Sequence, residues 1–189
     1  MTSRSRKRPA NSRSVDAISL LTQDHRKVKR LLKQLDNTSE RATAERQSLL
    51  KEIENEIKIH SKIEEQIFYP AYKEAARQSD DHVYYEALEE HHLVDIVLPE
   101  MKATDAGSEG FGAKAKVLRD LIEHHAEEEE STMFPKARKA LGAERLRELG
   151  EQIQSQKEQL QSGLLTRAAR TAGSAFGMAM SRNRKNRVA

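Results

Sequence analysis

The sequence has no cysteine, and only 4% of its 189 residues are aromatic. Without cysteine the chain can form neither disulfides nor thiolate-bound metal sites, and it has no cysteine nucleophile. This absence fits a reducing compartment, so we expect a cytoplasmic protein. No apolar run approaches the roughly 20 residues that a membrane-spanning helix needs. No apolar segment follows the basic first residues, so the sequence predicts no export signal.

Several functional motifs are also missing. The sequence has no glycine-rich phosphate loop, Ser-His-Asp arrangement or nucleotide-binding fingerprint, and we interpret the glycines within 104–112 as turn residues. It shows no helix-turn-helix pattern and no basic patch interleaved with aromatics, so we expect no specific nucleic-acid partner.

What the chain has in quantity is charge and helix-forming residues. Charged residues make up 33% of it, and Glu, Lys, Leu, Ala, Gln and Arg dominate between its ends. This composition predicts an all-α protein, and the length suits one domain with tails. The net charge of +3 conceals an acidic body, because residues 1–14 hold five Lys/Arg, residues 165–189 hold six, and neither segment holds an acid.

Apolar residues spaced three and four apart predict helices over about 15–35, 40–69, 80–102 and 113–133. We expect a bundle over 15–140, then an additional polar helix within 141–163, whose inner row looks too weak for a core helix. Residues 1–14 and 164–189 are predicted to be disordered basic tails, although the second alternates small apolar and basic residues as a surface helix would. Such tails attract phosphate groups without reading sequence.

One short motif occurs twice. His60 and Glu64 lie four residues apart, and His125 and Glu129 repeat this pair after a shift of 65. In both copies a proline follows six residues after the glutamate. Residues four apart share one face of a helix, so each imidazole and carboxylate can reach the same ion.

A second pair of histidines follows almost the same shift. His25 and His91 are 66 residues apart, each lies on an apolar stripe, and each follows an acid, Asp24 or Glu90. The chain is therefore two copies of one helical hairpin, which predicts an antiparallel four-helix bundle.

Four histidines and two glutamates on inner rows would be costly to bury without a cation. Imidazole and carboxylate ligands suit iron, manganese or zinc, and two carboxylates on facing helices suit a site for two metal ions with bridging glutamates. The predicted ligands are His25, His60, Glu64, His91, His125 and Glu129.

Neighbouring residues compete for these roles. His92 and His124 lie about 100° around the helix from the chosen histidines. His124 also forms a possible pair with Glu128, but that pair is out of register with the proline. We prefer His91 and His125.

Other polar residues could stand near the site. Asp95, Glu65 and Glu130 could lie just outside the ligands or belong to a charged face. We interpret Tyr69, Tyr72 and Tyr84 as packing residues, and we expect His82 to face solvent.

These motifs resemble the hemerythrin-like family with its HHE cation-binding domain. The resemblance covers about 15–140 and rests on the two acid–histidine pairs, the two His-x-x-x-Glu motifs, and the segments Phe68-Tyr69-Pro70 and Phe134-Pro135. It implies a four-helix bundle that holds two iron ions in a non-haem di-iron centre with an oxo or hydroxo bridge.

The resemblance also implies a range of functions. Some members bind oxygen reversibly, and others are linked to oxygen or iron sensing, peroxide handling, or repair of iron centres. The oxygen carriers have a second histidine where this chain has Asp95, and an aspartate five residues after the last histidine where this chain has Glu129 after four. Both departures indicate the bacterial type. The missing cysteine argues against the repair proteins, which carry an N-terminal cysteine-bearing segment.

The sequence therefore predicts a di-iron protein that binds or senses dioxygen or another small oxidant. The alternative is a di-iron enzyme that acts on peroxide or ferrous iron. No pocket for an organic substrate is recognisable, which favours the binding role.

Overall fold

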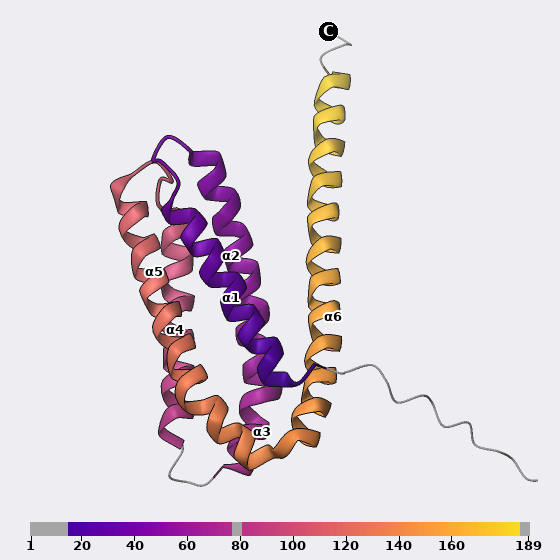
Figure 1. Cartoon of the computed structure of the whole chain (residues 1–189). Coiled ribbons are helices and arrows are strands. Elements are labelled where there is room, and N and C mark those ends of the chain that lie inside the picture. Colours follow the sequence, from indigo (N-terminus) through magenta and orange to yellow (C-terminus); the bar gives the residue numbers. More distant parts are fainter. Residues whose placement is uncertain (1–14, 77–80, 186–189) are drawn as a thin grey trace, which may run out of the picture.

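The computed structural model describes residues 15–76 and 81–185, and within them every regular element is a helix (Figure 1). Two hairpins, α1 with α2 and α4 with α5, pack against each other as a four-helix bundle, which confirms the predicted all-α fold. The four helices are α1 (Ala17–Asp36), α2 (Thr43–Ile63), α4 (Asp81–Ala103) and α5 (Glu109–Glu128).

The second helix of each hairpin widens into a π-helical turn where its His-x-x-x-Glu motif ends. α2 passes into the π-helical turn η1 (Glu64–Phe68) and then into α3 (Tyr69–Ala75). α5 passes into η3 (Glu129–Met133) and then into α6 (Phe134–Lys185). Each π-helical turn thus begins at the glutamate of a repeated motif.

The prolines explain the wider turns. In a regular α-helix the ring of a proline collides with the carbonyl four residues earlier. Here the residue before each proline donates its backbone N–H to the backbone carbonyl of the glutamate five residues earlier. Tyr69 donates to Glu64 and Phe134 donates to Glu129. The wider turn makes room for the ring, so the chain stays helical through Pro70 and Pro135.

The apolar core consists of two clusters, one toward each end of the bundle. The first is built around Leu21, Ile63 and Phe68, and the second around Val28, Ile53 and Leu118. On α1, His25 lies between Leu21 of the first cluster and Val28 of the second. The polar residues of the repeated motifs therefore form a layer between two apolar clusters.

At one end the loops are held together by a buried arginine. Arg46 donates from Nε to Thr38 Oγ1 at 2.9 Å and from a terminal nitrogen to the carbonyl of Ala106 at 2.8 Å. Because these partners belong to the α1–α2 and α4–α5 connections, Arg46 ties the two hairpins to each other.

A fifth helical segment completes the core, and the prediction of a weak inner row was wrong here. Gly142, at φ 73°, breaks α6 and turns the chain, and the segment after it packs against the first cluster. Leu146, Leu149 and Ile153 are at most 2% exposed. Three apolar residues suffice because they meet a complementary apolar face on α1 and α3, which periodicity along one segment cannot show.

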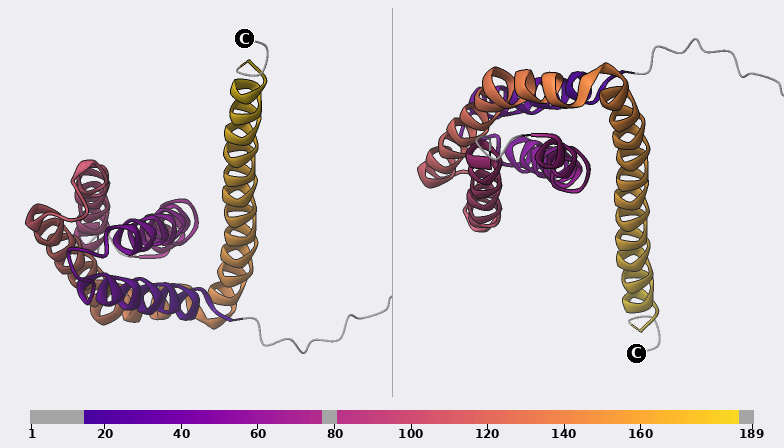
Figure 2. Two further views of the ribbon diagram at one scale, coloured as in Figure 1. Left: turned by 90° about the horizontal axis from the view of Figure 1, so that it is seen from above. Right: turned by 90° about the horizontal axis from the view of Figure 1, so that it is seen from below.

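α6 also runs further than predicted. Its backbone is helical to Lys185, where the sequence had suggested a disordered tail, and its far end stands clear of the bundle (Figures 1 and 2). The many Ala, Leu, Met and Arg residues in this segment favour helix. The predicted N-terminal tail, 1–14, and residues 186–189 lie outside the described residues. Among the described helices, none has the length and apolar character to cross a membrane.

The close approach of α6 to the start of α1 yields a prediction. A Cβ on Gly150 would collide with the carbonyl oxygen of Val15 and lie 3.1 Å from the backbone nitrogen of Ala17. We expect Gly150→Ala to destabilise the protein by about 1–3 kcal/mol in thermal unfolding, as overpacking does.

Gly163→Ala is the matched control. It lies on the same helix, where an added Cβ meets nothing within 4 Å, so the change should be neutral or stabilise by up to about 1 kcal/mol. Equal melting temperatures for both variants would show that the contact between α6 and α1 is not a tight one.

Candidate metal centre

All six predicted ligands are buried, and they lie in the polar layer between the two apolar clusters. Each of the four bundle helices contributes one histidine, and each π-helical turn contributes its first residue, a glutamate. The six are His25 on α1, His60 on α2, Glu64 on η1, His91 on α4, His125 on α5 and Glu129 on η3.

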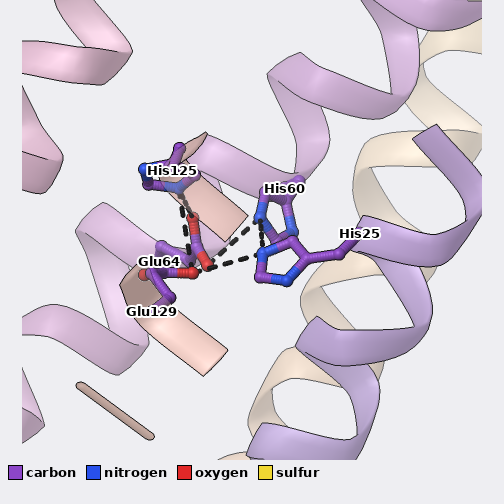
Figure 3. A group of neighbouring side chains, drawn as sticks. All are labelled: His25, His60, Glu64, His125 and Glu129. Atoms are coloured by element: carbon purple, nitrogen blue, oxygen red, sulfur yellow. Dashed lines mark hydrogen bonds and ion pairs between the residues drawn. The ribbon is translucent and has the colours of Figure 1, made fainter. Parts of the chain in front are cut away.

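Five of the six side chains form one tight group, with one ligand atom of each within 4.8 Å of all the others (Figure 3). The members are His25, His60, Glu64, His125 and Glu129. His91 lies outside this group but adjoins it, because its Nε2 is 3.3 Å from Glu64 Oε2. The layer therefore brings together the whole set that the sequence predicted.

The histidines of α1 and α4 are held from behind by the second glutamate of a π-helical turn. His25 Nδ1 lies 2.9 Å from Glu130 Oε1, and His91 Nδ1 lies 2.9 Å from Glu65 Oε1. Each of these glutamates belongs to the other hairpin, so the contact links the two halves of the repeat.

The histidines of α2 and α5 are held by the acids that precede the other two histidines. His125 Nδ1 lies 2.7 Å from Glu90 Oε2, and His60 Nδ1 lies 3.5 Å from Asp24 Oδ2. A carboxylate beside Nδ1 keeps the proton there and leaves Nε2 as the free electron pair. All four histidines therefore have a carboxylate at Nδ1, the arrangement that orients metal-binding histidines.

Several inward atoms form no hydrogen bond, although they lie close to ligand-type atoms of neighbouring side chains. Glu64 Oε1, Glu129 Oε2 and the Nε2 atoms of His91 and His125 are buried and form no hydrogen bond within the described chain. The Nε2 atoms of His25 and His60 face each other at 3.1 Å. Buried polar atoms are normally satisfied, so electron pairs that converge in this way fit a bound cation.

Without a metal, protons would supply the positive charge. Burial alone would lower the pKa of His60, but the carboxylates of Glu64 and Asp24 outweigh it and raise the pKa to about 10. Burial alone would raise the pKa of Glu64, but His60, His125 and His91 hold it well below its usual range. Glu64 is therefore held as an ionised carboxylate that is neutralised by surrounding cations.

Tyr69 belongs to this layer, so its interpretation as a packing residue was incomplete. Its hydroxyl donates to Glu129 Oε1 at 2.9 Å, and its ring stacks on His91 with the centroids 5.7 Å apart. Burial and the carboxylate of Glu129 raise the pKa of Tyr69 well above its usual value, which keeps the hydroxyl a donor. At the equivalent place in the repeat, Phe134 stacks on His25 at 5.8 Å but has no hydroxyl.

The competing residues point elsewhere. His92 and Asp95 are exposed, and the side chains of His124 and His82 are 61% and 81% exposed. Of the three acids considered as neighbours of the site, Glu65 and Glu130 contact ligand candidates and Asp95 does not. The roles of Asp24 and Glu90 were not predicted, although each precedes a histidine in both halves of the repeat, which was the available signal.

A small cavity adjoins the four histidines. Its apolar wall takes one residue from each bundle helix, and these are Val28, Ile57, Val94 and Ile122. Ser61 and Glu90 also line the cavity, so these four aliphatic residues form one side of a partly polar space.

A helical bundle with a buried layer of histidines and carboxylates defines a class of metal-binding proteins. Residues 16–137 match the hemerythrin HHE cation-binding domain, so the chain belongs to this family and has a cation-binding domain. This match confirms the resemblance to the hemerythrin-like family that the sequence motifs indicated.

Two known proteins are similar to this chain, one in structure and one in sequence. The crystal structure of a hemerythrin HHE cation-binding domain-containing protein from Mycobacterium kansasii aligns with a TM-score of 0.70 at 27% identity, over 80% of this chain and 91% of that one. A DNA nickase from Nostoc sp. (strain PCC 7120) is 24% identical over 145 residues, which are 77% of this chain. The chain spans only 40% of that protein's length.

Metal removal tests the layer as a whole. A metal at a hundredfold its dissociation constant stabilises the folded state by about 2.7 kcal/mol, which is roughly 5–10 °C for a chain of this size. We expect the melting temperature of loaded protein to fall by that amount after stripping with a chelator and dialysis. His60→Ala should show little difference between the two preparations, and a similar drop in that variant would assign the effect to metal bound elsewhere.

Proposed function

We propose that the layer holds a non-haem di-iron centre with His25, His60, Glu64, His91, His125 and Glu129 as ligands. The observation that carries this proposal is the position of the two glutamates. Glu64 lies 3.1 Å from His60 Nε2 and 3.3 Å from His91 Nε2. Glu129 lies 3.2 Å from His25 Nε2 and 3.7 Å from His125 Nε2.

Each glutamate therefore stands between histidines of two different helices. The two oxygens of Glu64 face different histidines, whereas Oε2 of Glu129 faces both of its histidines and Oε1 accepts from Tyr69. A carboxylate in such a position could bridge two ions, as in the carboxylate-rich helical bundles. The donor set of imidazole and carboxylate fits iron, manganese and zinc alike. We choose iron, with an oxo or hydroxo bridge, because the chain belongs to the hemerythrin family.

We further propose that the centre binds or senses dioxygen or a related small oxidant. Iron, when bound, supplies the capacity to exchange electrons with such a molecule. The chain supplies the rest: a small cavity adjoins the four histidines, with the aliphatic residues Val28, Ile57, Val94 and Ile122 on its wall, and it can admit only a small molecule. The hydroxyl of Tyr69 donates a hydrogen bond to Glu129, which stabilises negative charge on that carboxylate.

The alternative is an enzyme that acts on peroxide or ferrous iron. Tyr69 is the observation that favours it, because its buried hydroxyl offers a hydrogen-bond donor beside the candidate ligands, which its counterpart Phe134 cannot do. Nicking of DNA is not proposed, since the matched region is a minor part of the nickase.

Iron content tests the ligand set. Protein made in iron-replete cells should contain about two irons per chain by elemental analysis. His91→Ala should lower that content because it removes a buried donor, whereas His92→Ala, one residue away and exposed, should not. Fewer than one iron per chain after careful reconstitution would rule out the di-iron centre.

Reaction with oxygen separates the two functions. Dioxygen is added to the reduced protein and the visible spectrum is followed, and then peroxide is supplied and its consumption is measured. A new band that disappears when oxygen is removed supports binding or sensing. Sustained peroxide turnover far above that of free iron, lowered at least tenfold in Tyr69→Phe, would support the enzyme instead.

A further inference from the structure

The two halves of the repeat differ at the outer side of the polar layer. In the first half, Lys157 of α6 contacts Oδ1 of Asp24, the acid whose other oxygen faces His60. The side chain of Lys157 is only 20% exposed. The chain thus places a cation against the outer oxygen of the carboxylate that supports a ligand histidine.

Among the described residues no lysine contacts the equivalent acid of the second half, but ligand-type side chains surround it. Glu90 corresponds to Asp24, and its outer oxygen Oε1 lies 3.6 Å from His124 Nε2. Glu128 Oε1 lies 3.8 Å from the same nitrogen. One ligand atom from each of these three residues lies within 4.8 Å of the other two.

The sequence differs between the halves in a matching way. A shift of 65 relates His124 and Glu128 to Ile59 and Ile63. Both isoleucines are buried in the apolar cluster that includes Leu149 and Ile153 of α6. Where α6 covers the bundle, the two positions are apolar and Lys157 supplies the cation. In the other half they are a histidine and a glutamate.

We propose that Glu90, His124 and Glu128 form a second metal site, which binds one divalent transition-metal ion at the surface between α4 and α5. Ligand atoms about 2.1 Å from one ion lie roughly 3.0–3.5 Å apart, so small side-chain movements would bring these atoms into range. One imidazole and two carboxylates suit zinc, manganese or ferrous iron. The ion would take the place that the Lys157 ammonium occupies in the first half.

The site reaches the inner layer through one residue. Glu90 Oε2 lies 2.7 Å from His125 Nδ1, while Oε1 faces His124. An ion on Oε1 would draw charge from the carboxylate and weaken its hold on His125, as Lys157 acts on Asp24. In the first half, where that cation is present, the carboxylate-to-imidazole distance is longer, 3.5 Å against 2.7 Å. The surface site is therefore placed to adjust the inner centre.

The test uses the full chain with its inner metal in place. Zinc is added, and calorimetry and elemental analysis count the ions bound beyond those already present. Wild-type protein should bind one further zinc ion. His124→Ala should lower the affinity for that ion at least tenfold, and Glu128→Gln should weaken it as well.

His82→Ala is the matched control. His82 and Glu86 form an exposed pair with the same four-residue spacing, 3.2 Å apart, but no third ligand is grouped with them among the described residues. This variant should bind zinc as the wild type does. Equal zinc binding by wild type and His124→Ala, or an equal loss in His82→Ala, would overturn the proposal.

These outcomes are separate from those of the di-iron proposal. A missing inner centre would lower the inner metal content of wild type and His124→Ala alike. A missing surface site would leave the inner content intact and remove only the difference between the two proteins.

Discussion

Two carboxylates, Glu64 and Glu129, are buried among four imidazoles in the middle of an apolar bundle, and much of the structure serves to make that arrangement stable. A buried carboxylate without a counter-charge costs several kcal/mol. Each histidine therefore faces inward with Nε2 and outward with Nδ1, and each Nδ1 meets a further acid. The converging electron pairs leave a place for cations, which is consistent with membership of a cation-binding family.

The π-helical turns show how local sequence serves this layer. A proline six residues after the glutamate disfavours a regular turn, and the chain widens at the glutamate itself. The widened turn starts with a ligand candidate and continues with the acid that supports a histidine of the other hairpin, as Glu65 does for His91. One backbone irregularity thus aims two neighbouring carboxylates at two different partners.

The two halves of the repeat are not identical, and their differences lie beside the polar layer. Tyr69 and Phe134 occupy equivalent positions, but only the tyrosine adds a hydrogen-bond donor. α6 covers one side of the bundle and brings Lys157 to Asp24, while the other side leaves Glu90 beside His124. The two halves of the polar layer therefore have different surroundings.

The sequence by itself determined the helical class, the bundle, and the six residues of the polar layer. Helical spacing and an internal repeat are visible along the chain without knowing which segments pack together. His91 could be preferred over His92 for the same reason, since neighbours on a helix point about 100° apart. Only the tertiary structure decided the rest. The acids that support His60 and His125 lie on other helices, 36 and 35 residues away. The core role of Leu149 depends on a facing surface far away in the chain, and the contact of Lys157 with Asp24 joins residues 133 positions apart. Contacts between distant segments depend on how the elements pack, and no periodicity within a single segment encodes them.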